Sequence, residues 1–172
     1  GEPPSKWDEC FEGFVGMYYN LPASHADVEP EDELPGLPME ELDYWTKEYA
    51  AFTRFDASID WGANWWPVDN GLVEDPHYFA ARWIGWMRVY NRRDFEFVLS
   101  GTQDVWLKID DEIRVDLRDS EAFESATYSI NLTAGIHQID IRYAHRVGAQ
   151  NGFRFRVDHE DLVICYPEYQ ED

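Results

Sequence analysis

The sequence predicts an all-β protein, an antiparallel β-sandwich with one short helix and long acidic loop insertions. Three observations support this: apolar and polar residues alternate in successive segments after residue 78, no helical pattern separates these segments, and turn-forming pairs stand between them. With 172 residues, the chain is long enough for one domain with one core. We expect a lead-in over residues 1–12, the sandwich over 13–165 and a tail over 166–172.

The first strand is expected over residues 14–19, which are mostly apolar or aromatic. Residues 22–38 follow with four prolines, and residues 27–33 carry five carboxylates. Such a composition predicts an exposed loop, because it offers little that could pack into a core. A cation site in the acidic run is the alternative, although its carboxylates lack the glycine-centred spacing of a calcium-binding loop.

A short helix is expected over about residues 38–50. Pro38 stands at its first position, with Glu40 and Glu41 in the first turn, where the helix dipole favours acids. Apolar residues then recur at helical spacing, namely Leu42, Trp45, Tyr49 and Phe52. We expect this stripe to pack on the sandwich, and an exposed aromatic ridge is the alternative.

The later segments have the period of two that is typical of half-buried strands. Their inward residues are expected to be Phe95, Phe97 and Leu99; Val105, Leu107 and Ile109; Tyr128, Ile130 and Leu132; Ile139, Ile141 and Tyr143; and Phe153, Phe155 and Val157. Tight turns are expected at residues 91–92, 110–111, 134–135 and 151–152. Strands this close together without helices between them predict an antiparallel sandwich.

The charge excludes several classes of partner. The chain has 35 acidic and 14 basic residues, a formal net charge of −21, which repels nucleic acid and anionic lipid surfaces. Its sequence contains no apolar run of membrane-spanning length. We therefore expect neither nucleic-acid binding nor membrane insertion.

No catalytic signature stands out. The sequence lacks a Gly-x-Ser-x-Gly elbow, a His-Glu-x-x-His pair and a phosphate-binding loop, and its five histidines have no metal-ligand spacing. Pairs of carboxylates are expected by chance among 35, so they do not indicate a glycosidase. We expect a protein that is not an enzyme and has no cofactor.

Five segments in order resemble a known family: residues 13–20 (GFVGMYYN), 59–62 (IDWG), 79–85 (FAARWIG), 105–110 (VWLKID) and 129–135 (SINLTAG). They are similar to the PA14 (PA-fourteen) domains, named after the anthrax protective antigen and present also in yeast flocculins and adhesins. The resemblance covers about residues 13–157. It implies a β-sandwich used outside cells, often to hold sugars and sometimes only to dock or build.

The lectin-like members of this family hold calcium through two consecutive aspartates before the Val-x-Leu-x-Ile-Asp strand, and the calcium binds sugar hydroxyls. Here the resemblance places Thr102 and Gln103 at the aspartate positions and Asp104 where the family usually has Gly. A site with one carboxylate should bind calcium weakly or not at all. Metal is therefore not expected, apart from weak calcium at Asp104.

The second loop of such a site corresponds to residues 145–152, where His145, Gln150 and Asn151 are candidate ligand-binding residues. The alternative is a plain hairpin with its turn at residues 151–152. Trp65 and Trp66 lie in a loop-like stretch, where one of them could be an exposed anchor for a sugar ring or a protein neighbour.

Two features would fit an extracellular protein of this family. Cys10 and Cys165 lie near opposite ends of the chain, and sandwich termini are often close together, so we expect a disulfide. Two buried free thiols are the alternative. Asn131 begins an Asn-Leu-Thr acceptor sequence for glycosylation, and strand alternation directs its side chain to solvent.

The resemblance therefore implies an extracellular, non-catalytic carbohydrate-recognition or adhesion module on a cell surface or appendage, with a weakened or absent calcium site. The alternative is a structural subunit or docking domain of an extracellular filament, sheath or surface layer, which could form a homopolymer. A third interpretation is an accessory domain of a glycoside hydrolase, which an attached catalytic sequence would indicate. The expected partners are carbohydrate or neighbouring protein subunits.

Overall fold

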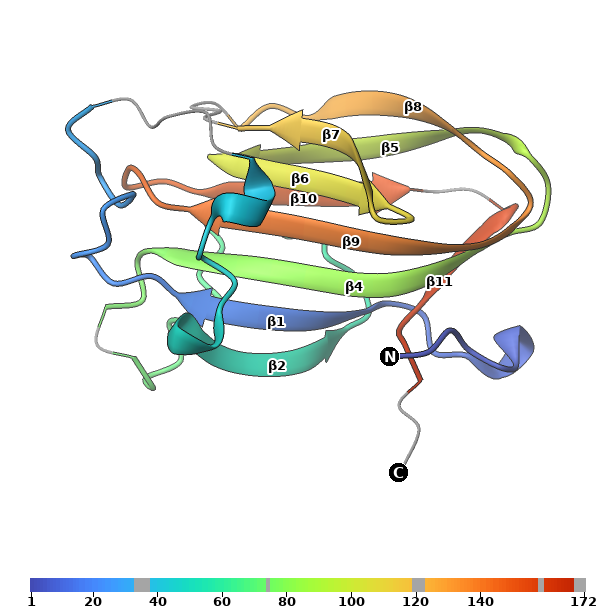
Figure 1. Ribbon diagram of the computed structural model, residues 1–172, viewed down its shortest axis with the longest axis horizontal. Coiled ribbons are helices and arrows are strands. Elements are labelled where there is room, and N and C mark those ends of the chain that lie inside the picture. The colour runs from blue at the N-terminus through green and yellow to red at the C-terminus, as the bar shows by residue number, and fades with distance from the viewer. Residues whose placement is uncertain (33–37, 74, 119–122, 158–159, 169–172) are drawn as a thin grey trace.

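Two antiparallel sheets pack face to face in the computed structural model, which describes residues 1–32, 38–73, 75–118, 123–157 and 160–168 (Figure 1). The larger sheet has seven strands, in the order β2 (Ala50–Asp56), β1 (Phe14–Asn20), β4 (Phe79–Val89), β9 (Gly135–His145), β6 (Asp104–Ile109) and β7 (Glu112–Leu117), with β11 (Leu162–Cys165) also paired to β4. The smaller sheet has the order β3 (Gly62–Ala63), β10 (Gly152–Val157), β5 (Arg93–Thr102) and β8 (Ala126–Leu132). The predicted antiparallel sandwich is confirmed.

The core lies between the sheets and follows the predicted alternation. Phe95, Phe97 and Leu99 of β5 are buried, as are the inward residues of β6 and β9. Of the predicted inward residues, Tyr128 and Val157 are only half-buried, because they lie nearer the margin of the packed region. The period of two works here because successive side chains of a pleated strand point to opposite faces.

The prediction of a helix over residues 38–50 is wrong, because the described residues contain no α-helix. This stretch forms two three-residue 3₁₀ turns, η2 (Met39–Glu41) and η3 (Lys47–Tyr49), and a third turn, η1 (Trp7–Glu9), precedes β1. The aromatic residues of the predicted stripe have different partners: Trp45 packs against a side cluster that contains Tyr19 and Leu21, while Phe52 belongs to β2. These tertiary contacts outweigh the helical spacing.

The acidic stretch after β1 is only partly the exposed loop that its composition predicts. Val28 is buried, the Tyr44 hydroxyl donates to Oδ2 of Asp27 at 2.8 Å, and the Tyr78 hydroxyl donates to Oε1 of Glu29 at 3.1 Å. Residues 31 and 32 are exposed, and residues 33–37 lie outside the described residues. Residues 27–29 therefore dock on one end of the sandwich.

The connection between β9 and β10 is not a plain hairpin. The two strands belong to different sheets, and Gly152 is already the first residue of β10. Residues 146–151 thus cross from the larger sheet to the smaller one, and Gln103, between β5 and β6, crosses in the opposite direction. The turn at Asp110 and Asp111, both with positive φ, joins β6 and β7 as predicted.

The expected disulfide is confirmed. Cys10 and Cys165 are bonded, with 6.0 Å between their Cα atoms and 155 positions between them in sequence. Beside it, Glu2 and Glu168 exchange two backbone hydrogen bonds of 3.0 and 2.9 Å. The first residues and the segment after β11 therefore lie together (Figure 1).

Candidate ligand site at the loop end of the sandwich

A cavity of about 520 Å³ opens at the end of the sandwich where β9 ends, on the left of Figure 1. We call it the loop-end cavity. Two of the connections between the sheets, from β5 to β6 and from β9 to β10, contribute to its wall, through Thr102, Gln103, Arg146, Val147, Gly148, Ala149 and Gln150. The structure therefore brings together the two loops that the resemblance paired.

Arg146 of this wall forms a buried ion pair with Asp104. Asp104 and Arg146 are 2% and 3% exposed, and Nε of Arg146 donates to Oδ2 of Asp104 at 2.7 Å while Nη2 donates to Oδ1 at 3.4 Å. Nη1 of Arg146 also donates to the carbonyl oxygen of Asp27 at 3.5 Å. A charge-assisted ion pair that is this deeply buried has a well-defined geometry, and removing one of its two partners destabilises the fold.

Gln103 ties the two connections to each other. Its Oε1 accepts hydrogen bonds from the backbone N–H groups of Arg146 at 2.8 Å and Val147 at 2.7 Å, and its Nε2 donates to the carbonyl of Val147. The peptide bond between Thr102 and Gln103 is cis. Oγ1 of Thr102 accepts from the backbone N–H of Gly152 at 3.2 Å. Both side chains are thus engaged by backbone groups.

These residues do not fit a calcium ion. Calcium needs six to eight oxygen ligands, but the Asp104 carboxylate is bonded to Arg146 and the side-chain oxygen of Gln103 is bonded to two N–H groups. The guanidinium of Arg146 also puts a positive charge beside the one carboxylate that the resemblance leaves for a metal. We therefore derive no step through calcium.

Asn151 is a structural clamp rather than a cavity residue. It is buried, its Oδ1 accepts from the backbone N–H of Trp65 at 2.7 Å, and its Nδ2 donates to the carbonyl of Trp65. Gln150, in contrast, is exposed and lines the cavity. Of the predicted residues in the second loop, Gln150 is the one whose side chain is accessible to a ligand.

Trp65 and Trp66 do not form an exposed platform, which corrects that expectation. Both are half-buried and pack against the core. Trp65 stacks on Trp61 with ring centroids 5.0 Å apart and meets Phe79 edge-on at 5.5 Å. Trp66 stacks on His77 at 5.0 Å. The hydrogen bonds between Asn151 and Trp65 hold this loop against the sandwich, so both rings pack within the molecule.

His145 is also inaccessible to a ligand. It is fully buried, its ring is 5.5 Å from that of Trp66 and 5.4 Å from that of His77, and neither nitrogen makes a regular hydrogen bond among the described residues. Burial, followed by the charge of nearby His77, lowers the pKa of His145 to about 4. The imidazole is therefore neutral near pH 7 and supports the cavity wall from below.

Sequence reasoning missed Arg146. The signal that could have found it is its position as the only basic residue in a loop where oxygen ligands were expected. Sequence alone does not show its partner, because Asp104 lies 42 positions away.

One group of residues with metal-ligand chemistry exists among the described residues, formed by His25, Asp27 and Asp43. Nδ1 of His25 accepts the backbone N–H of Asp27 at 3.0 Å, so the ring proton belongs on Nε2, which lies 2.8 Å from Oδ1 of Asp43. A metal on Nε2 would move that proton to Nδ1, against the N–H of Asp27. The group is therefore better suited to internal hydrogen bonding than to metal binding.

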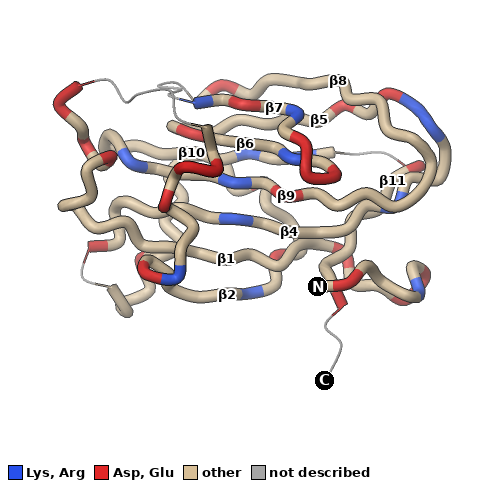
Figure 2. Tube along the Cα trace, in the orientation of Figure 1, with Lys and Arg blue, Asp and Glu red and all other residues tan. Residues whose placement is uncertain are grey.

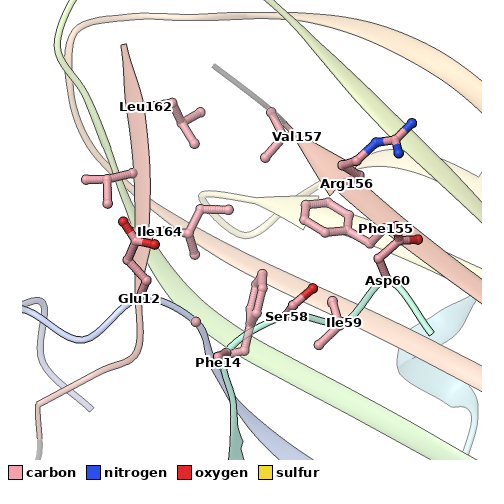
Figure 3. A pocket seen from close by; sticks show the side chains of 13 residues that line it. Glu12, Phe14, Ser58, Ile59, Asp60, Phe155, Arg156, Val157, Leu162 and Ile164 are labelled. Carbon is pink, nitrogen blue, oxygen red and sulfur yellow. The ribbon is translucent and has the colours of Figure 1, made fainter. Parts of the chain in front are cut away.

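Another cavity, of about 380 Å³, opens between the sheets at the opposite end (Figure 3). The rings of Phe14 and Phe155 meet edge-on at 5.9 Å in its floor, beside Ile164. Asp60 at its rim is paired with Arg154 at 2.9 Å. Its apolar floor and scattered rim groups do not define a ligand.

Charges are distributed unevenly over the described residues (Figure 2). Basic residues stand in the middle of the larger sheet, where Arg82 and Arg142 share Asp140, at 2.8 and 3.5 Å. Acidic residues gather in loops and near the N-terminus.

Asn131 is exposed, as predicted, with its side chain hydrogen-bonded to Arg92 and Asp94, and its glycosylation stays a prediction. None of the described helices has the length and apolarity of a membrane span.

Comparisons with known proteins agree with this architecture. No family model matches the sequence, and no curated protein matches it. Three solved structures match over nearly their whole length. The PA14 domain of the MpAFP antifreeze protein is 15% identical, with a TM-score of 0.65 and 98% of each chain covered. The PA14 sugar-binding domain of an RTX adhesin is 15% identical, with a TM-score of 0.59, 85% of this chain and 90% of that chain covered.

The third is the Epithelial Adhesin 9 A domain from Candida glabrata in complex with Galb1-3GlcNAc, at 13% identity and a TM-score of 0.57, with 99% of this chain and 91% of that chain covered. The chain also spans 46% of an anti-sigma factor domain-containing protein and 16% of a beta-glucosidase from Kluyveromyces marxianus. The matches to glycosidases thus cover only a small part of those chains. The chain has the fold of a PA14 domain.

Proposed function

We propose that this chain is a non-catalytic recognition module of the carbohydrate-binding or adhesion kind, that it works at the cell surface, and that it takes its ligand at the loop-end cavity without calcium. The observation that carries the proposal is a cavity walled by the β5–β6 and β9–β10 connections and braced by the buried pair of Asp104 and Arg146. Solved domains of the same fold that bind sugars support it.

The cavity offers hydrogen-bonding groups suited to a neutral sugar. The side chain of Gln150 can donate and accept, and it stands next to the exposed backbone of Ala149. Gly148 is already fixed by Glu29, which accepts its N–H at 2.6 Å, and by His77, whose Nε2 lies 2.8 Å from its carbonyl oxygen. This wall is preorganised, which lowers the entropy that binding costs. The net charge of −21 disfavours anionic sugars.

A glycan array, followed by calorimetry with the best neutral oligosaccharide, tests the proposal. Ala149→Trp should obstruct the cavity and reduce affinity at least about tenfold, and Gln150→Ala should weaken binding less. Ile136→Ala, an exposed apolar change far from this cavity, is the matched control and should leave affinity unchanged. Added chelator should change nothing in the unmodified protein.

Four results would contradict the proposal. Full affinity in Ala149→Trp would place the ligand elsewhere, and loss of binding in chelator would restore a metal site. Cleavage of the bound oligosaccharide, detected by mass spectrometry, would make the protein an enzyme. Concentration-dependent polymerisation without sugar binding, measured by light scattering, would favour a structural subunit instead.

A further inference from the structure

Three aromatic rings stack on the surface near the disulfide, at the opposite side of the molecule from the loop-end cavity. Tyr166 lies between Phe11, with ring centroids 5.6 Å apart and planes within 4°, and Phe55, with centroids 4.5 Å apart. Phe11 is 69% exposed and Phe55 is 59% exposed. We call these three rings the aromatic ladder. Exposed apolar groups that gather in this way mark an interaction site more often than single exposed ones do.

The aromatic ladder is held in place from three directions. The backbone N–H of Tyr166 donates to the carbonyl of Phe11 at 3.1 Å, and the neighbouring residues Cys10 and Cys165 are bonded to each other. Phe55 is fixed separately, opposite Val15 in the pairing of β2 with β1. A cavity of about 330 Å³ adjoins the ladder and is lined also by Pro4, Glu9 and Glu168. The surface is therefore preorganised.

The surroundings of the ladder are acidic. Residues 1–12 carry four carboxylates and one lysine, Lys6, which lies 4.0 Å from Glu9. Glu168 adds a further carboxylate at the rim of the cavity. Aromatic faces attract cations, and carboxylates beside them strengthen that attraction. This combination favours a basic partner over a neutral sugar, and the net charge of −21 disfavours a second copy of the chain.

The neighbouring backbone favours a polypeptide over a small cation. Phe55 belongs to β2, which is the terminal strand of the larger sheet, so no strand of the described residues pairs with one edge of β2 (Figure 1). An extended segment can add to such an edge through main-chain hydrogen bonds, while alternate side chains reach the surface next to it.

We propose that the aromatic ladder and the open edge of β2 form a docking surface for an extended, basic segment of another protein. Arginine or lysine side chains of that segment lie against Phe11 and Phe55 and pair with Glu9 and Glu168.

The test uses fluorescence anisotropy at physiological salt with a labelled peptide of alternating Arg and Thr. Because an acidic protein attracts cations everywhere, the decisive variant is Phe11→Ala/Phe55→Ala, which keeps every charge. We expect this double change to lower affinity for the peptide at least about tenfold. Leu72→Ala/Ile136→Ala removes two exposed apolar side chains elsewhere and should leave affinity unchanged. Thermal unfolding confirms that each variant is folded.

Two further comparisons complete the test. A peptide with citrulline in place of Arg should bind much more weakly, and Glu9→Gln/Glu168→Gln should weaken the Arg peptide. Equal affinity for the unmodified protein and Phe11→Ala/Phe55→Ala would overturn the proposal, as would no detectable binding at all. Binding of a neutral oligosaccharide that depends on Phe11 and Phe55, in place of the Arg peptide, would assign the surface to sugar.

Discussion

Arg146 and Asp104 form a buried ion pair, with Nε of Arg146 2.7 Å from Oδ2 of Asp104. The pair joins the loop after β9 to the first residue of β6, at the place where the sequence resemblance would put a calcium site. A positive side chain thus neutralises the carboxylate from within the chain.

Removing Arg146 should destabilise the protein strongly. In Arg146→Gln the Asp104 carboxylate stays buried without its charged partner, which typically costs about 3–5 kcal/mol. Denaturant unfolding measures the loss. Asp104→Asn/Arg146→Gln should regain part of it, because no unpaired charge remains, and the double-mutant cycle gives the coupling energy. Additive losses in the cycle would mean that the two side chains do not act as a pair.

Calcium should have no effect on the unmodified protein. The side-chain oxygens of Asp104 and Gln103 are bonded to Arg146 and to backbone N–H groups. Calorimetry at physiological salt should show no binding tighter than about millimolar, and melting temperature should not change with calcium or chelator. A micromolar site that disappears in Asp104→Asn would contradict this.

Acid should weaken the fold through His145. Its pKa is about 4 in the folded protein, below the ordinary value of 6.5, so the unfolded chain binds more protons between these pH values. The free energy of unfolding should therefore fall as pH drops from about 6.5 to 4, by up to about 3 kcal/mol from this residue. His145→Phe should remove that part of the slope in denaturant titrations. Parallel pH curves for the two proteins would show that His145 is not responsible.

The disulfide should contribute substantially to stability. Cys10→Ser/Cys165→Ser frees a loop of 155 positions in the unfolded chain, so the free energy of unfolding should drop by up to about 5 kcal/mol. Urea unfolding measures this, and non-reducing mass spectrometry after alkylation checks the bond. Two alkylated thiols in the native protein would disprove the pairing.

Trp65 should prove to be a residue of the fold. Its ring contacts Tyr18, Trp61 and Phe79, so Trp65→Ala should lower the free energy of unfolding by about 3 kcal/mol. Leu72→Ala, at a side chain 79% exposed, is the control and should change stability by less than about 0.5 kcal/mol. A stable Trp65→Ala variant that loses ligand binding would return the residue to the binding role first predicted for it.

Much of the strand pattern could be predicted from sequence because the signal is local. In β5 and β9, neighbouring residues alternate between core and outer face, and the pattern repeats within a few positions. The exposure of Asn131 followed from the same alternation. Local patterns failed between residues 38 and 56, where Trp45 and Phe52 have helical spacing but pack against different clusters of the sandwich.

The sequence by itself determined the all-β class, the positions of most strands and the resemblance that pairs residues 102–104 with 145–152, because each depends on neighbouring residues or on motif order. Only the tertiary structure decided what these residues do. Arg146 reaches Asp104, and Asn151 reaches Trp65 across 86 positions, because the segments that follow β3, β5 and β9 lie together at one end of the sandwich. Contacts between residues so far apart depend on the packing of the whole chain, which no local pattern records.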